Sequence, residues 1–155
     1  MNINNDAQLR EALAALEPAR QRGLAARFVE NVLALSHDER VKRAVAAAAN
    51  PDTTDADRQA AYKAAKAAAL EAHARCGADG EWNDQAGYFV ARAAEAALAP
   101  QVRSHGKGPA WQAALSCRMA RTASVSEGAS ETDEDAPDSE SESAAQYRIL
   151  NDYLS

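Results

Sequence analysis

Two histidines and two cysteines are the residues of this sequence best suited to metal chemistry. His73 and Cys76 are one helical turn apart, and His105 and Cys117 follow further along the chain. Zinc sites use such ligands, but they usually group them as Cys-x-x-Cys or His-x-x-x-His pairs. Neither pair occurs here, so we assign these four residues to packing or to the surface and predict no metal site.

Other signatures of catalysis are also missing from the sequence. No serine lies in a nucleophile-elbow motif, and the segment HGKGP lacks the spacing of a phosphate-binding loop. Nothing in the chain meets the requirements of an active site. We therefore predict a protein that is not an enzyme and has no catalytic residue and no cofactor.

The most distinctive segment is acidic and rich in serine. Residues 124–143 hold eight of the 23 acidic residues and none of the 17 basic ones, whereas the other 135 residues carry a net charge of +2. Such a composition cannot bury enough apolar surface to fold by itself, which favours a solvated loop. It lacks the residue order of an EF-hand calcium loop.

The same segment could also attract a basic partner, because clustered carboxylates speed the encounter with a cationic surface. It could alternatively occupy a nucleic-acid groove of a partner by mimicking the charge of nucleic acid. We predict that the partner-binding residues are its eight carboxylates: Glu127, Glu131, Asp133, Glu134, Asp135, Asp138, Glu140 and Glu142.

The remainder of the chain is patterned for helices. Alanine, the best helix former, accounts for 40 of the 155 residues, while the β-branched and aromatic residues typical of sheets are scarce. Apolar spacing and capping residues predict helices over residues 6–16, 19–35, 36–49, 54–75, 83–99, from 109 onward and 143–155. The third helix should begin with a capping box at Ser36 and Glu39, and Cys76-Gly77 should end the fourth.

The predicted fold is all-α, a compact bundle of six to seven antiparallel alanine-rich helices. Residues 1–123 would form the bundle, 124–143 an acidic loop, and 144–155 a C-terminal helix packed on the bundle. We expect the fourth and fifth helices to dock closely, because small side chains let helix axes approach to about 8 Å. The expected core residues are Phe28, Phe89, Trp111 and Leu115, and Met119 lies on the same stripe as the last two.

Composition also limits the cellular setting. No apolar run reaches the roughly 18–20 residues that span a bilayer, and the polar N-terminus does not resemble a secretory signal. Two isolated cysteines do not indicate a disulfide framework. We therefore expect a cytoplasmic protein that does not interact with membranes.

Four segments together resemble an alanine-rich family of bacterial immunity proteins, the predicted partners of polymorphic toxins. They are LAARFVENVLAL, DERVKRAVAAAAN, DADRQAAYKAAKAAALEAHARC and AGYFVARAAEAALAP, and the terminal QYRILNDYL adds to the likeness. The resemblance covers roughly residues 20–123 and the last dozen. The acidic insert departs from the family pattern. The resemblance implies a non-enzymatic protein that binds and neutralises a cognate toxin.

Three hypotheses follow for the function. The first is an immunity or antitoxin-like inhibitor whose acidic segment attracts the basic groove of a toxin. The second is a phage or mobile-element inhibitor of a defence complex that mimics nucleic acid, and the third is a helical scaffold or adaptor. In each the partner is a protein, and in the first two it presents a basic surface. The chain itself would be a monomer or homodimer without direct nucleic-acid binding.

Overall fold

The computed structural model of the chain describes residues 2–79, 83–100, 108–127 and 139–155. These residues form seven α-helices and one short 3-10 helix, with no strand among them. The elements are α1 (Asp6–Ala14), α2 (Pro18–Glu30), η1 (Leu33–Leu35), α3 (Glu39–Ala49), α4 (Asp55–Asp79), α5 (Asn83–Leu98), α6 (Pro109–Glu127) and α7 (Ser139–Leu154). The prediction of a compact all-α bundle is confirmed.

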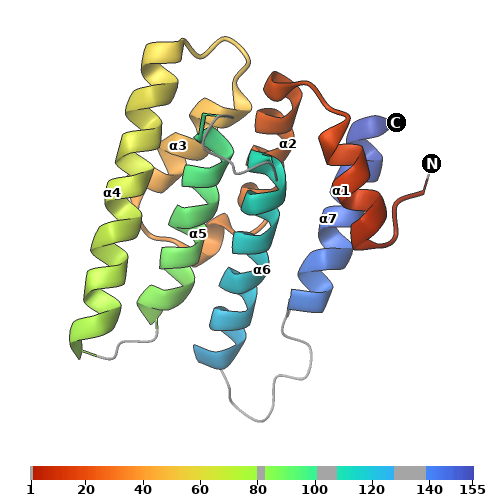
Figure 1. Cartoon of the computed structure of the whole chain (residues 1–155). Coiled ribbons are helices and arrows are strands. Elements are labelled where there is room, and N and C mark those ends of the chain that lie inside the picture. The colour runs from red at the N-terminus through yellow and green to blue at the C-terminus, as the bar shows by residue number, and fades with distance from the viewer. Residues whose placement is uncertain (1, 80–82, 101–107, 128–138) are drawn as a thin grey trace.

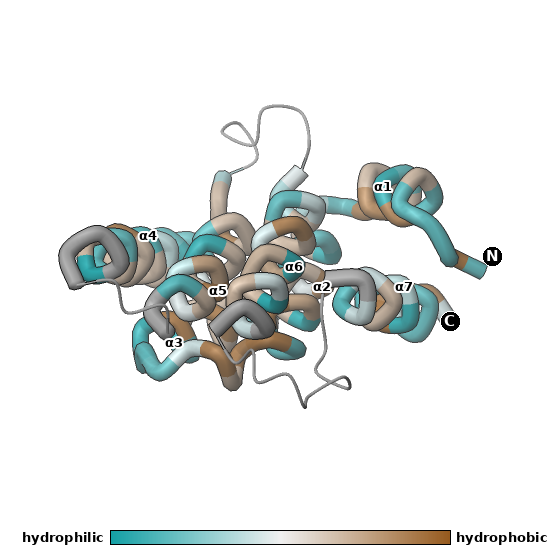
Figure 2. Tube along the Cα trace, turned by 90° about the horizontal axis from the view of Figure 1, so that it is seen from below, coloured by the Kyte–Doolittle hydropathy of each residue, from teal (hydrophilic) through white to brown (hydrophobic). Residues whose placement is uncertain are grey.

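Three helices form a layer at the centre of the fold. Helices α4, α5 and α6 lie side by side, and α2 and α3 cover one side of this layer (Figures 1 and 2). Helices α1 and α7 lie at the edge of the bundle next to α6, where the two chain ends also meet (Figure 1). The close docking of α4 on α5 that the sequence predicts is confirmed, and α5 docks on α6 as extensively.

Alanine forms the contact surface between the central helices. Helix α6 buries Ala110, Ala113, Ala114, Ala120 and Ala123, and α5 faces it with alanines that are also buried. Larger core side chains come from α1 and α2, above all Leu9, Leu24 and Phe28, each with no exposed surface. Small side chains let the helices approach closely, so burial is achieved by backbone proximity more than by large side chains.

Leu115 is a correction to the predicted core. Its side chain is 40% exposed, and Met119, one turn further along α6, is 49% exposed. Phe28 is fully buried as predicted, whereas Phe89 and Trp111 are partly buried. Helix α6 has two apolar stripes, and the alanine stripe is the one that faces α5 and α2, because only small side chains fit so close to a neighbouring helix.

Several predicted helix limits also differ from the structure. Helix α2 ends at Glu30 instead of continuing to residue 35, because the Asn31 carbonyl accepts a hydrogen bond from Arg121 Nη2 at 2.7 Å. The expected capping box of α3 is wrong: Asp38 caps this helix and accepts from Arg40 N at 2.9 Å. Helix α4 continues past Gly77 to Asp79.

The stretch between α6 and α7 is shorter than the predicted loop 124–143. Helix α6 continues to Glu127, and α7 already begins at Ser139. Serine and acidic residues are well tolerated in the first turn of a helix, where they complement the exposed amide groups and the positive helix end. The C-terminal helix therefore includes residues that the sequence assigns to the loop.

Asn151 holds the N-terminal segment on α7. Its side-chain amide accepts a hydrogen bond from Ile3 N at 2.9 Å and donates one to the Ile3 carbonyl at 3.0 Å, and the Ile3 side chain is buried. Across the described ranges, none of the helices has the length and hydropathy needed to cross a bilayer.

Candidate functional site

Of the eight carboxylates predicted to bind a partner, Glu142 is the one whose side chain the structure describes. Glu131, Asp133, Glu134, Asp135 and Asp138 lie outside the described residues. Glu127 belongs to α6 and Glu140 to α7, but their side chains are also outside the description. The structure therefore fixes the two helix ends from which the acidic segment leaves, at Glu127 and Ser139.

Glu142 is an internal residue of the fold and differs from the solvated carboxylate that the sequence predicts. Its side chain is 1% exposed, and it pairs with Arg121 Nε at 3.0 Å. Asn31 Nδ2 donates to both of its oxygens, each at 3.0 Å. A buried carboxylate with these partners is not free to bind another protein, and it joins α7 to α6 and to the end of α2.

A second polar cluster joins α7 to α6 and α1. Arg118 binds both oxygens of Asp6, at 2.9 and 2.7 Å, and its Nε donates to Gln146 Oε1 at 2.9 Å. The Tyr147 hydroxyl donates to Asp6 at 2.7 Å. The hydrogen bond from Arg118 lowers the pKa of Asp6, whereas burial and the bond to Asp6 raise the pKa of Tyr147. The two clusters fix the helices that flank the acidic segment.

The structure does not bring the predicted metal-ligand candidates together within its described part. His73 stacks on Tyr88, with ring centroids 5.4 Å apart, and Cys117 is fully buried, which raises the pKa of its thiol. The Cys76 side chain and His105 lie outside the described residues. No cluster of three or more His, Cys, Asp or Glu side chains suited to a metal ion is found in the described ranges.

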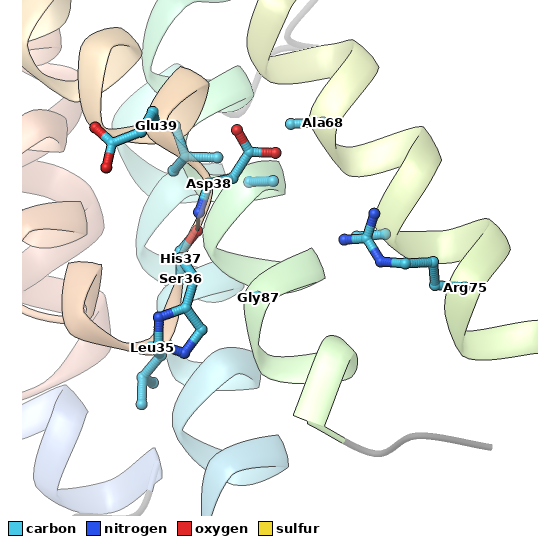
Figure 3. Close-up of a pocket in the computed structure, with 11 residues that line it drawn as sticks. Leu35, Ser36, His37, Asp38, Glu39, Ala68, Arg75 and Gly87 are labelled. Atoms are coloured by element: carbon cyan, nitrogen blue, oxygen red, sulfur yellow. Dashed lines mark hydrogen bonds between the residues drawn. The ribbon is translucent and has the colours of Figure 1, made fainter. Parts of the chain in front are cut away.

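A cavity of about 400 Å³ lies between the start of α3 and helices α4 and α5. Figure 3 shows Asp38 on one side of it and Arg75 extending from α4 on the other, with Gly87 on α5 between them. Asp38 pairs with Arg40 at 2.8 Å, and Arg40 also pairs with Glu71 at 2.6 Å. The bond from Arg40 lowers the pKa of Asp38. The charges beside this cavity are therefore largely neutralised by one another, and their role is to join α3 to α4.

The large exposed apolar side chains of the central layer come from α4 and α6. Leu70 of α4 is 61% exposed, and Leu115 and Met119 of α6 are 40% and 49% exposed. Tyr88 and Phe89, both partly buried, lie on α5 between these helices. Their rings meet edge to face, with centroids 5.1 Å apart. We name this set of exposed and partly buried residues of α4, α5 and α6 the open face; it comprises Leu70, His73, Tyr88, Phe89, Leu115 and Met119.

The sequence reasoning missed the open face because it assigned the Trp111-Leu115-Met119 stripe to the core. A signal was present in the sequence. Positions 110, 113, 114, 117, 120 and 123 form a second stripe of small residues on the same helix. In a chain this rich in alanine, the small-residue stripe is the better candidate for the closest helix contact.

The chain matches no protein-family model, no curated protein and no solved structure. The fold therefore defines the class, an all-α bundle, and the resemblance to immunity proteins remains a prediction.

Proposed function

We propose that this protein is a non-enzymatic, protein-binding inhibitor of the immunity or antitoxin type that neutralises a cognate bacterial toxin. The observation that carries the proposal is the open face, in which Leu70 of α4 and Leu115 and Met119 of α6 are large apolar side chains exposed to solvent. Grouped exposed apolar side chains on a soluble protein are typical of surfaces that bind other macromolecules.

The second support is electrostatic. Helix α6 carries Leu115 and Met119 and ends at Glu127, where the acidic segment follows in the sequence. Helix α7, which comes after that segment, is held on α6 by the bonds of Arg118 to Gln146 and of Arg121 to Glu142. The end of α6 and the start of α7, between which Glu131, Asp133, Glu134, Asp135 and Asp138 stand in the sequence, lie at the same end of the bundle (Figure 1). The partner that fits is a protein with a basic groove beside an apolar patch.

The two parts would contribute differently to binding. Apolar side chains that become fully buried at an interface contribute most of the affinity and slow dissociation. Clustered charges mainly accelerate association, and their effect weakens as salt screens them. A toxin with a basic active-site groove would be attracted by the acidic segment and held by the open face.

The test is neutralisation of a toxin encoded by the gene next to this one. Co-expression of the chain should rescue cells that the toxin kills, and the purified proteins should form a complex. Leu115→Lys combined with Met119→Lys should weaken binding by roughly tenfold or more, since it removes apolar contacts at the expected centre. Leu154→Lys is the matched control, because Leu154 is 43% exposed on α7, away from the open face.

Replacing Glu131, Asp133, Glu134 and Asp135 by their amides should lower the association rate and flatten its salt dependence while leaving the dissociation rate nearly unchanged. Failure to rescue, together with no complex between the purified proteins, would overturn the proposal. Full binding by the Leu115/Met119 variant would show that the open face is not the contact surface.

A further inference from the structure

A second cavity lies at the end of the bundle opposite the acidic segment. It has a volume of about 410 Å³ and is formed where the first turns of α2 and α4 meet the end of α5 and the start of α6. Among the described residues, its charged lining side chains are Arg22, Arg58, Lys63 and Asp55, which together carry a net charge of +2. Because charged side chains of mostly one sign line a concave surface, the cavity concentrates a positive potential.

Arg22 is the residue that distinguishes this cavity from the one beside Asp38. It has no ion pair with any carboxylate in the described part of the chain, and partial burial and the nearby Arg58 lower its pKa. Arg58, in contrast, pairs with Asp55. An arginine that lies beside another arginine without a carboxylate of its own costs the fold stability, and such residues are typical of ligand-binding sites.

The neighbouring arginines have contacts that Arg22 lacks. Arg22 and Arg58 also line an adjoining cavity that contains Arg20 and Arg27. Those two stack on the ring of Tyr153, at 5.2 and 5.1 Å from its centroid. Cation–π contact stabilises them in place, so Arg22 is the guanidinium left available for an added anion.

Apart from Gln59, the other described lining residues of the cavity are apolar or aromatic. They are Tyr62, Leu98, Ala99 and three prolines, Pro18, Pro100 and Pro109. Leu98 and Pro109 are buried, so this wall is part of the packed structure. An inorganic anion would use the cationic side and leave the apolar wall without contacts, whereas a molecule with a flat apolar body would use both.

We propose that this cavity binds a small phosphate monoester with an aromatic or otherwise flat apolar body. A phosphate monoester carries about −1.5 to −2 charges at neutral pH, which matches the net charge of the lining. A guanidinium can donate two parallel hydrogen bonds to phosphate, and Arg22 supplies such a group, with the positive charges of Arg58 and Lys63 on the same lining. This inference does not depend on the proposed function, because it concerns another end of the molecule.

The test uses phenyl phosphate as the probe, with inorganic phosphate and benzoate as comparisons. Binding is measured at low salt by calorimetry, and the site is located by amide chemical-shift changes. Phenyl phosphate should bind at least about tenfold more tightly than either comparison, a difference of about 1.4 kcal/mol. The shift changes should centre on the first turns of α2 and α4.

Arg22→Gln should weaken phenyl phosphate binding about tenfold or more while the variant melts at the same or a higher temperature. Lys63→Gln, at an exposed position, should weaken binding without affecting the fold, and Arg148→Gln is the control, an exposed arginine on α7. Equal binding by wild type and the Arg22 variant would overturn the site. Benzoate or inorganic phosphate binding as tightly as phenyl phosphate would overturn the assigned ligand class.

Discussion

Glu142 and Arg121 form an ion pair of 3.0 Å in which the glutamate side chain is 1% exposed and the arginine 19%. The pair joins the first turn of α7, which begins at Ser139, to the last two turns of α6, which ends at Glu127. Glu142, the one carboxylate of residues 124–143 whose side chain the structure describes, is therefore a structural residue. This contact gives Glu142 a role in joining α7 to α6.

Replacing Glu142 by alanine should destabilise the protein by about 3–5 kcal/mol, because it leaves Arg121 and Asn31 without their buried partner. Urea unfolding followed by circular dichroism measures the change. Glu11→Ala is the control, since Glu11 is exposed on α1, and it should change stability by less than about 0.5 kcal/mol. Equal stability of the two variants would contradict an internal role for Glu142.

Two leucines of α7, one turn apart, should respond very differently to truncation. Leu150 is fully buried and Leu154 is 43% exposed. Leu150→Ala should cost about 2–5 kcal/mol, from lost burial and a residual cavity, and Leu154→Ala about 0.5 kcal/mol or less. Thermal or urea unfolding of the two variants checks the placement of α7 on the bundle, and similar losses would show that its rotation is different.

Overpacking the central helix contact should also be costly. Ala113 of α6 is fully buried against the neighbouring helices, so Ala113→Leu should destabilise the fold by about 1–3 kcal/mol. Ala60→Leu tests the same substitution on the exposed surface of α4 and should be nearly neutral. The difference in unfolding free energy between the two variants measures how closely α5 and α6 pack, and no difference would argue against alanine-mediated contact.

Acid should weaken the contact between α1 and α6. The hydrogen bond from Arg118 lowers the pKa of Asp6 below its unfolded value of about 3.8. The stability that this contact contributes is therefore fully present above that value and is lost as the pH falls through the lower folded pKa. Asp6→Asn should flatten the fall of stability that occurs as the pH drops below the unfolded value of about 3.8. Urea midpoints above and below this value provide the measurement, and an unchanged slope would contradict the assignment.

The same cluster has an effect at high pH through Tyr147, whose pKa is raised by burial and by its bond to Asp6. The folded state keeps this proton at a pH where the unfolded state has lost it, so stability should fall as the pH rises above about 10. Tyr147→Phe should reduce that loss. Spectrophotometric titration of the phenol at its ionisation band would show the raised pKa directly.

The sequence by itself determined that this protein is helical and approximately where its helices lie. Forty alanines, apolar residues at helical spacing and prolines at the starts of α2 and α6 act locally, within one or two turns. Local effects of this kind can be read from a single chain. The predicted ends of α2 and α4 were less accurate. The Asn31 carbonyl at the end of α2 accepts a hydrogen bond from the distant Arg121, and α4 continues through Gly77 instead of ending there.

Only the tertiary structure decided which of the two apolar stripes of α6 is buried, and it exposed Leu115 while burying the alanines. It also buried Glu142 against Arg121 and placed Arg22 near Arg58. The two residues of each pair are far apart in the sequence. Each of these outcomes depends on which helices become neighbours and how closely their backbones approach. The way in which the helices pack depends on contacts between distant parts of the chain, so the spacing of residues within one helix does not predict it.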